Sequence, residues 1–311
     1  MAAGHRNANR NEDHNMNTAT KTEFKAFRDN YAVNMEKMFA ALSDVYAKYW
    51  NDLLHFALFD NDSQTFDDAF RKTHDFYMDA LGVSQATHIA DLACGRGGFA
   101  RAMAERTAGH VTGIDISRAQ LSHARKRTLP NLAFRQHDIM KIDELGETFD
   151  AVSFMDAACY LPDKMLAIKK IKKILRPGAR FLFIDWCKQD GLSAVQEELV
   201  LHPFMRYWNL SSLETQARYE RCFRKNGFEI LDMRDFNDRT RRNWDFGYDA
   251  AIKAVKELSL GDIPKMVWTG IRLGPDAIRI VKEEFPAALY IKAGFDTGFL
   301  RYSYFLLRNP E

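Results

Sequence analysis

Apolar residues along the middle of the chain follow two alternating spacings. Short apolar runs recur between residues 89 and 184, and a stretch with helical spacing follows each run. Strands that alternate with helices predict a parallel, doubly wound α/β sheet. Two further alternating runs, at 228–236 and 299–307, complete a predicted sheet that is mostly parallel and seven-stranded.

Helix-spaced apolar residues precede this alternation and also interrupt it. Residues 24–49 and 65–81 carry apolar side chains at three- and four-residue steps, which marks one apolar face on each predicted helix. Because both stretches come before the first strand, we predict that they lie across the carboxyl ends of the strands as a lid. Two later helical stretches, at 188–211 and 239–297, are predicted to be cap insertions.

The same pattern sets the predicted domain boundaries. Residues 1–22 are rich in asparagine, histidine and arginine and poor in apolar residues, which predicts a disordered tail. The remaining segments, in order, are a helical lid at 23–81, an α/β core at 82–187, a first helical cap at 188–211, more of the core at 212–238, a second helical cap at 239–297 and the last core strand at 298–311.

A glycine-rich turn follows the first predicted strand. The stretch Asp91-Leu-Ala-Cys-Gly-Arg-Gly-Gly98 leads directly into a helical stretch at 99–106. Glycine lets the backbone approach a ligand closely, because it has no Cβ and accepts positive φ. The next strand ends at Asp115, where a second strand–helix unit places an acid on ribose hydroxyls. The turn alone is weak evidence, since dinucleotide-binding folds use one too.

The stretch from Asp91 to Gly98 resembles the nucleotide-binding motif of class I S-adenosylmethionine-dependent methyltransferases. The resemblance spans 82–185 closely and 213–310 more loosely, and it implies a Rossmann-like methyltransferase fold. The spacing G-x-G-G, in place of G-x-G-x-x-G, disfavours NAD. Further landmarks stand in the family's order: Asp115, Gln136-His-Asp-Ile139, Phe149 to Asp156, and Leu175 to Asp185.

The resemblance implies S-adenosylmethionine as cofactor and assigns its contacts. Asp91 and the turn would hold the methionine end, Asp115 the ribose hydroxyls, Ile116 the adenine face and Asp138 the adenine amine. Asp138 also suits a helix N-cap, since Ile139 and the next residues read as helical. The implied cofactor residues are Asp91, Ala93, Gly95, Gly97, Asp115, Ile116, Gln120, Asp138, Ile139 and Met155.

Three residues are candidates for catalysis. Asp156 ends the fourth predicted strand, which faces bound cofactor in this fold. The sterol, tocopherol and prenyl diphosphate C-methyltransferases that the chain resembles often carry glutamate there, so Asp156 would remove a proton or stabilise a cation. A helix N-cap is the alternative role. Tyr160 and His55 complete this set, with His55 as a possible base.

Aromatic and basic residues in the lid and caps are candidates for substrate contact. Aromatic ring faces stabilise cations by roughly 0.5–2 kcal/mol each. Basic residues cluster at Arg234, Arg239, Arg241 and Arg242. Arginine suits the oxygens of a diphosphate, although a solvated set of ion pairs would explain the same cluster. Tyr49-Trp50 with His55 resembles the lid stretch of the sterol and tocopherol relatives. The candidate substrate residues are Tyr49, Trp50, Trp186, Trp208, Trp244, Arg239 and Arg242.

Composition narrows the classes of partner. Among 311 residues the net charge is +2, which disfavours a nucleic-acid partner. No apolar run approaches the roughly 18 residues of a membrane span, so a cytoplasmic protein is expected. The four cysteines show no Cys-x-x-Cys spacing, which predicts reduced thiols and no metal site. A helical lid exchanged between subunits would allow a homodimer.

These observations support three readings of function. The first is C-methylation of a small apolar metabolite in secondary metabolism, an isoprenoid or prenyl diphosphate, through a carbocation. The second is a natural-product O- or N-methyltransferase in which His55 or Asp156 takes the proton of a hydroxyl or amine. The third, from another class, is a non-catalytic module with a methyltransferase fold, which the acids at Asp91, Asp115 and Asp138 count against.

Overall fold

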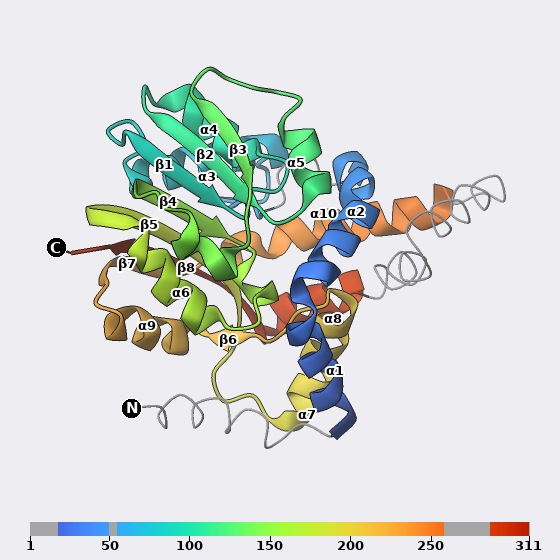
Figure 1. Ribbon diagram of the computed structural model, residues 1–311. Helices are drawn as coiled ribbons and strands as arrows, with labels where there is room; N and C mark the ends of the chain where they lie inside the picture. The colour runs from blue at the N-terminus through green and yellow to red at the C-terminus, as the bar shows by residue number, and fades with distance from the viewer. Residues whose placement is uncertain (1–17, 50–54, 258–286, 311) are drawn as a thin grey trace.

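The computed structural model describes residues 18–49, 55–257 and 287–310, and these form a mixed sheet covered by helices (Figure 1). The strand order is β3-β2-β1-β4-β5-β8-β7, and all neighbours pair in parallel except β8, which is antiparallel to β5 and β7. The short β6 pairs with the end of β5. The strands are β1 His88–Leu92, β2 His110–Asp115, β3 Leu132–Gln136, β4 Phe149–Met155, β5 Leu175–Lys188, β6 Glu214–Thr215, β7 Glu229–Asp235 and β8 Leu300–Arg308.

This sheet confirms the predicted doubly wound α/β class, with one addition. The two-residue β6 makes eight strands within the described chain where seven were predicted. Glu214 and Thr215 extend along Cys187 and Lys188, and the helix α9 begins directly after them at Gln216. The side chain of Thr215 then caps α9 by accepting the backbone N–H of Arg218.

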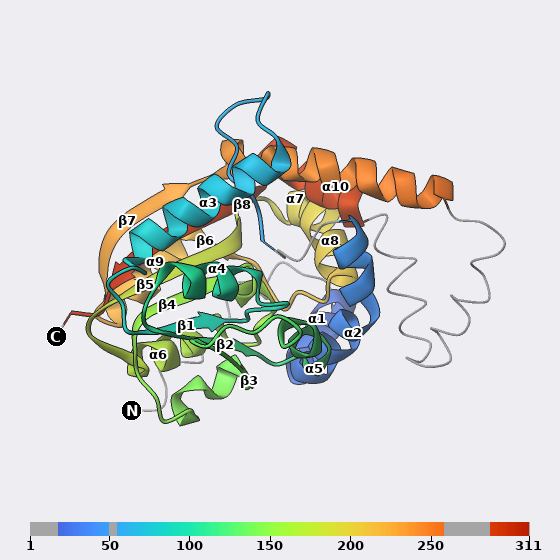
Figure 2. The same ribbon diagram turned by 90° about the horizontal axis from the view of Figure 1, so that it is seen from above.

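Helices cover both faces of the sheet. Successive side chains of a strand point to opposite faces, so Leu182 and Phe183 of β5 belong to two separate buried clusters. The first cluster includes side chains of α4 (Gly98–Arg106) and the second includes side chains of α6 (Lys164–Lys173) and α9 (Gln216–Lys225). Figure 2 shows the sheet between these layers.

Helix α3 (Phe66–Leu81) corrects one prediction. It lies on a face of the sheet beside α4 rather than across the carboxyl ends of the strands (Figure 2). Its Tyr77 ring stacks 6.2 Å from Tyr304 of β8, and the carbonyl of Ala80 accepts a hydrogen bond from Arg180 of β5. The apolar face of α3 therefore completes the core, and residues 65–81 do not form a lid.

The first two helices do lie at the edge predicted for a lid. A break at Asn30 divides the expected single helix into α1 (Thr18–Asp29) and α2 (Tyr31–Tyr49). Helix α2 packs against α5 (Arg118–Ala124), next to the carboxyl end of β2 (Figure 1). Most of the predicted tail lies outside the described residues, but α1 begins at Thr18, inside the segment assigned to that tail.

The two cap insertions are helical as well. The first contains α7 (Ala194–Gln196), the π-helical turn η3 (Glu197–Leu201) and α8 (His202–Tyr207), and it packs beside α1. The second begins with α10 (Asn237–Glu257), and residues 287–297 are helical before β8. Two short 3-10 turns follow strands of the core: η1 (Ile139–Glu144) after β3 and η2 (Ala158–Tyr160) after β4.

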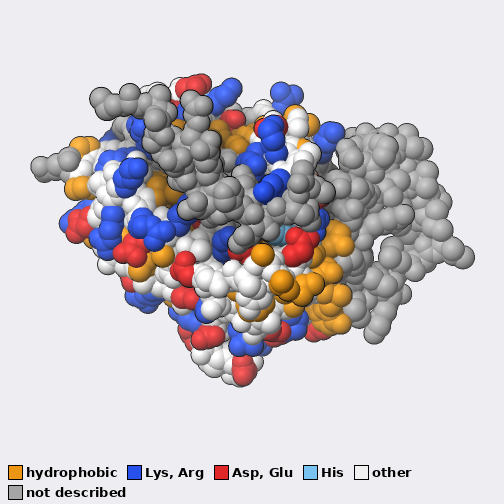
Figure 3. Space-filling model, turned by 90° about the horizontal axis from the view of Figure 1, so that it is seen from below, with side chains coloured by type: hydrophobic (Ala, Val, Ile, Leu, Met, Phe, Trp, Pro, Cys, Tyr) orange, Lys and Arg blue, Asp and Glu red, His pale blue; other side chains and the backbone are white. Residues whose placement is uncertain are grey.

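The surface and the thiols add little specific chemistry. No helix among the described residues is long and apolar enough to cross a membrane. Basic and acidic side chains are interspersed on the face shown in Figure 3. All four cysteines are free thiols, and the described part of the chain has no cluster of metal-ligating side chains.

Candidate active site

The glycine-rich turn between β1 and α4 adopts the strained backbone that its residues suggest. Ala93, Gly95 and Gly97 have φ of 56°, 54° and 76°, in the left-handed region that glycine accepts without cost. Ala93 carries a Cβ, so its backbone is mildly strained in this region, where glycine would not be. The turn is held by Asp115 of β2, whose two carboxylate oxygens accept the N–H groups of Gly95 and Ser117 at 2.8 Å each.

Two carboxyl groups beside this turn are buried. Asp91, at 3% exposure, accepts a hydrogen bond of 2.7 Å from Ser153 of β4. Burial raises the pKa of Asp91 to about 7, although Ser153 opposes the rise and the charge of Asp115 adds to it. Burial likewise raises the pKa of Asp115 to about 6, against the N–H groups of Ser117 and Gly95.

These carboxyls lack a basic partner in the described chain, since neither forms an ion pair. A carboxylate has about four lone-pair sites, so Asp115 retains capacity for hydroxyl donors beyond its two N–H groups. A ligand that brings a cation to Asp91 and hydroxyls to Asp115 would restore the balance of charge and hydrogen bonds. The methionine amine and ribose of S-adenosylmethionine have that chemistry, so the donor set fits the predicted cofactor.

The predicted adenine end lies between β3, α5 and α2. Asp138 follows β3 and caps η1, where its Oδ1 accepts the N–H of Met140 at 2.8 Å and also the hydroxyl of Tyr31 from α2. Both interpretations of Asp138 thus remain compatible, because its second oxygen is left for a ligand. Among the other predicted cofactor residues, Ile116 is half-buried and Gln120, Ile139 and Met155 are buried.

Asp156 sits at the tip of β4 in a conformation unusual for its residue type. Its φ is 53°, which a non-glycine residue adopts at a cost of order 1–3 kcal/mol when the surroundings impose it. Its Oδ2 accepts the Tyr302 hydroxyl at 2.9 Å and the Phe56 N–H at 3.3 Å. The carboxyl is therefore held by β8 and by the segment before α3, and it does not cap a helix.

The electrostatic surroundings of Asp156 favour its protonated form. Burial raises the pKa of this carboxyl well above its usual range. Repulsion from Asp185 adds to the rise, whereas Tyr302, the Phe56 N–H and the nearby Trp186 indole oppose it. A carboxylate with a raised pKa is a stronger base and gains most from an adjacent cation.

Aromatic rings surround this carboxyl. The Phe56 ring lies 5.0 Å from that of Tyr302, 5.2 Å from that of Trp186 and 5.7 Å from that of Trp244. Trp208 joins the group, 5.5 Å from Trp186 and 6.2 Å from Trp244. We call these five side chains the aromatic box. The sequence singled out its three tryptophans, and the structure brings them together.

Phe56 and Tyr302 were missed as site residues. Phe56 is adjacent to His55, and Tyr302 lies inside the last predicted strand, so both were recognised only as aromatic or strand residues. Their contact with Asp156 joins positions 100 and 146 residues apart. No spacing rule in the sequence indicates such a contact.

The structure places the predicted site residue Tyr160 but only part of the predicted Tyr49-Trp50 pair. Tyr160 is buried in η2, and its ring centroid lies 6.0 Å from that of Phe39 of α2 in an edge-on arrangement. Tyr49 is the last residue of α2, and Trp50 lies outside the described residues. The roles of these three side chains therefore stay predictions.

His55 forms a pair that the sequence did not indicate. Its Nε2 lies 2.9 Å from Nε2 of His74 on α3, and its ring packs against Phe70 and Phe99. Burial lowers the pKa of His55 to about 4. Burial and then the charge of His55 lower the pKa of His74 to about 3. Both imidazoles are thus neutral at pH 7, and one donates a hydrogen bond to the other.

We expect His74→Gln to make folding less sensitive to acid. The folded pKa of His74 is below the unfolded value of 6.5, so the stability that this neutral imidazole contributes is complete above pH 6.5 and is lost as the pH falls toward 3. Glutamine keeps a hydrogen bond to His55 without titrating. When the pH is lowered from 7.5 to 5, the free energy of unfolding of the variant should rise by up to roughly 2 kcal/mol relative to that of wild type, at about 1.4 kcal/mol per pH unit.

Urea unfolding at both pH values measures this difference. Lys72→Gln, at an exposed position of the same helix, serves as the control and should show no such change. Parallel pH dependence of wild type and His74→Gln would contradict the neutral pair.

Arg239 and Arg242 make protein contacts in the structure. Arg239 pairs with Asp60 at 2.6 Å. Arg242 donates to the carbonyls of Asn61 and Gln64 at 3.0 and 3.2 Å, and its guanidinium lies 4.6 Å from the Phe59 ring. These contacts hold the segment before α3 against α10. A diphosphate at this cluster stays a prediction, and it would have to compete with them.

Known proteins resemble this chain in sequence. Residues 89–178 match the model of a methyltransferase domain. Sterol 24-C-methyltransferase ERG6B of Gibberella zeae is 30% identical over 56% of this chain and 48% of its own length, so the match spans about half of that relative. Cycloartenol-C-24-methyltransferase 1 of Oryza sativa subsp. japonica is 29% identical over 92% of this chain and 88% of its own length.

Solved structures resemble it in fold. Mycolic acid cyclopropane synthase CmaA1, complexed with SAH and CTAB, superposes with a TM-score of 0.75 at 14% identity, over 89% of this chain and 98% of that chain. Geranyl diphosphate methyltransferase, in complex with GPP and sinefungin, superposes with a TM-score of 0.62 at 16% identity, over 90% and 99%. At these identities the likeness is one of fold.

Proposed function

We propose that this chain is a class I S-adenosylmethionine-dependent methyltransferase and that it methylates a carbon of an isoprenoid or prenyl diphosphate in secondary metabolism. One observation carries the proposal: Asp156 is held at the tip of β4, beside the cofactor turn and inside the aromatic box. A buried acid among ring faces suits an acceptor that becomes positively charged.

The cofactor supplies an activated methyl group when bound, and Asp91, Asp115 and the turn at Gly95 and Gly97 would hold it. The residues of the aromatic box exclude water and present ring faces to the acceptor. Such faces stabilise a cation by roughly 0.5–2 kcal/mol each. Asp156 would then take a proton from the carbon next to the cationic centre, and the electrons of that C–H bond would restore a double bond.

The names of related proteins support this acceptor class. The two sequence relatives are named for methylation at C-24 of a sterol and of cycloartenol. The geranyl diphosphate methyltransferase shares the fold over most of both chains. These proteins are named for isoprenoid acceptors, and all three names describe a methyl transfer.

The alternative is O- or N-methylation of a natural product, in which His55 or Asp156 would take the proton of a hydroxyl or amine. Both imidazoles of the His55–His74 pair stay neutral at pH 7, but their lowered pKa values make them weak bases, so the raised pKa of Asp156 favours that carboxylate as the base. His55 lies next to Phe56, whose N–H contacts the same carboxylate. The homodimer and the cytoplasmic location stay predictions.

Label transfer distinguishes these functions. The protein is incubated with methyl-labelled cofactor and separate panels of prenyl diphosphates, sterols, phenols and amines, and mass spectrometry locates the label. Label on carbon of an isoprenoid supports the proposal. Label on oxygen or nitrogen alone supports the alternative, and cofactor binding without transfer to any panel would favour a non-catalytic module.

We expect Tyr31→Phe to weaken cofactor binding without changing the fold. The Tyr31 hydroxyl joins α2 to Asp138, so its loss should loosen the predicted lid over the adenine end. A hydrogen bond to a charged group contributes about 1.5–3 kcal/mol, which corresponds to roughly a tenfold or greater rise in Kd. Calorimetric titration measures this Kd. Tyr290→Phe, on the helical segment before β8, is the control, and equal affinities of all three proteins would contradict the lid.

A further inference from the structure

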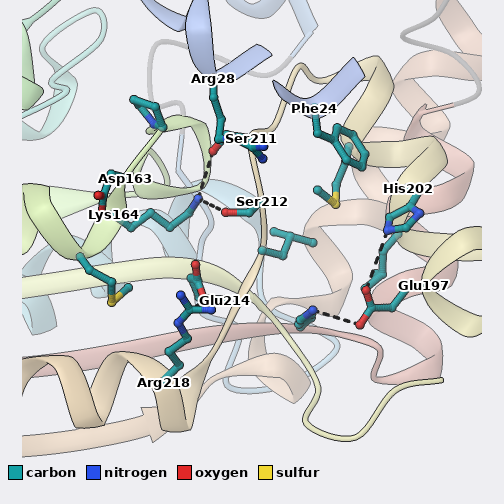
Figure 4. A pocket seen from close by; sticks show the side chains of 16 residues that line it. Phe24, Arg28, Asp163, Lys164, Glu197, His202, Ser211, Ser212, Glu214 and Arg218 are labelled. Atoms are coloured by element: carbon teal, nitrogen blue, oxygen red, sulfur yellow. Dashed lines mark hydrogen bonds and ion pairs between the residues drawn. The ribbon is translucent and has the colours of Figure 1, made fainter. Parts of the chain in front are cut away.

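A pocket with a polar lining lies away from the glycine-rich turn. It encloses about 100 Å³ between α1, the start of α6, the end of β5 and the first cap (Figure 4). This volume is several times the roughly 10–15 Å³ needed for one water. No residue assigned above to cofactor, acceptor or catalysis lines it. The pocket is therefore separate from the proposed methylation site.

Lys164 is the central group of this pocket. It is only 3% exposed, and its ammonium donates hydrogen bonds to Ser212 Oγ at 2.7 Å, Ser211 Oγ at 3.2 Å and the Leu161 carbonyl at 3.4 Å. All three acceptors are neutral. A buried charge without a counter-charge is costly, so this arrangement favours a bound anion.

The acidic side chains of the pocket are already engaged. Glu214 pairs with Arg218 at 3.1 Å, and Glu197 pairs with Lys188 at 3.0 Å. Asp163 accepts the backbone N–H of Leu166 and so caps α6. The lining thus offers Lys164 no carboxylate within ion-pair distance in the described chain.

Asp185 does not fill this role either. Its charge interacts with Lys164 at longer range, but its side chain is completely buried and does not line the pocket. Its two oxygens accept the hydroxyl of Tyr219 at 2.6 Å and the N–H of Cys159 at 3.0 Å. The ammonium of Lys164 therefore faces the pocket without an adjacent anion.

A second cation reaches the same place from the N-terminal helices. Arg28 of α1 is half-buried, points toward Ser211 and Ser212 in Figure 4, and forms no ion pair with a described carboxylate. Together with Lys164 and the two hydroxyls, it makes a set of donors around one cavity. Lysine, arginine and serine donors in combination suit the several oxygens of a phosphoryl group.

We propose that this pocket binds the phosphoryl group of a small anionic ligand, with Lys164, Arg28, Ser211 and Ser212 as its contacts. The proposal does not depend on which acceptor is methylated. Because Arg28 belongs to α1 while Lys164 belongs to the core, the bound anion also fastens α1 to the sheet domain. Occupancy should therefore protect the N-terminal helices as well as raise the melting temperature.

Thermal unfolding of the full chain with inorganic phosphate, inorganic diphosphate or acetate tests this site, with sodium chloride added to equal ionic strength. Phosphate or diphosphate should raise Tm saturably by roughly 2–4 °C. The shift should disappear in Lys164→Gln and Arg28→Gln and persist in Arg234→Gln, which changes an exposed arginine paired with Asp232. Limited proteolysis of α1 should slow in parallel.

Arg28→Gln and Ser212→Ala keep the test decisive if the buried Lys164→Gln variant does not fold. A phosphate-induced shift that persists in both variants overturns the site. A shift equal to that of sodium chloride overturns it too, because general screening then explains the effect. A shift with acetate as large as that with phosphate overturns the phosphoryl assignment.

Discussion

Replacing Asp156 with asparagine is expected to lower the rate of methyl transfer by about 10²–10⁴-fold, the usual effect of losing a general base. The amide keeps the shape of the side chain and can still accept the Tyr302 hydroxyl and the Phe56 N–H. It has no negative charge to offset a cation and no useful basicity. The affinity for cofactor should change little, because the Asp156 carboxyl accepts hydrogen bonds from Tyr302 and Phe56 and none from the turn in the described chain. Single-turnover kinetics and cofactor titration separate the two effects.

The pH dependence of the same variant adds a second criterion. Burial raises the pKa of Asp156 well above its usual range, so the wild-type rate should increase with pH as the carboxylate forms. The asparagine variant should lose this rise. Asp232→Asn, at a β7 position that pairs with Arg234, is the control and should behave as wild type. Normal turnover in Asp156→Asn would mean that the carboxyl serves only to hold β4, β8 and Phe56 together.

Replacing Asp115 with alanine is expected to weaken cofactor binding at least tenfold. Asp115 is the acid predicted to bind the ribose hydroxyls, and hydrogen bonds to a charged group contribute about 1.5–3 kcal/mol each. The change also removes the acceptor for the N–H groups of Gly95 and Ser117, so the turn loses its support. Both effects lower the affinity for the cofactor. Calorimetric titration with the cofactor measures the loss.

Asp115→Asn distinguishes direct contact from support of the turn. Asparagine keeps one acceptor oxygen and lacks the charge, so its Kd should lie between those of wild type and Asp115→Ala. Far-ultraviolet circular dichroism of all three proteins checks that the fold is retained. Unchanged affinity in Asp115→Ala would remove the ribose contact from the assignment.

Local signals were enough to identify the core of this protein. Strand and helix periodicities depend on residues two to four positions apart, so the sequence alone determined the alternating elements from 88 to 188. The turn between Asp91 and Gly98 and the acid at Asp115 are equally local, because each occupies the end of a strand. Parallel strands then bring those ends to one edge of the sheet. The fold class could therefore be predicted, and so could the turn on which the proposed cofactor site rests.

Only the tertiary structure decided how the rest of the candidate site is assembled. Asp156 could be a cap or a catalytic acid by sequence, and its contacts with Phe56 and Tyr302 come from elements 100 and 146 residues away. Helix α3 looks like another lid helix, since an amphipathic face does not specify which apolar surface it will cover.

Tertiary packing also decided the roles of the charged side chains. Arg239 and Lys164 are both basic residues in the first turn of a helix, yet Arg239 pairs with Asp60 while Lys164 is buried among neutral oxygens. The electrostatic role of a side chain depends on its desolvation and its neighbours, and both are properties of packing. Sequence periodicity determines which elements form, whereas long-range packing determines which charges are neutralised and which remain for a ligand.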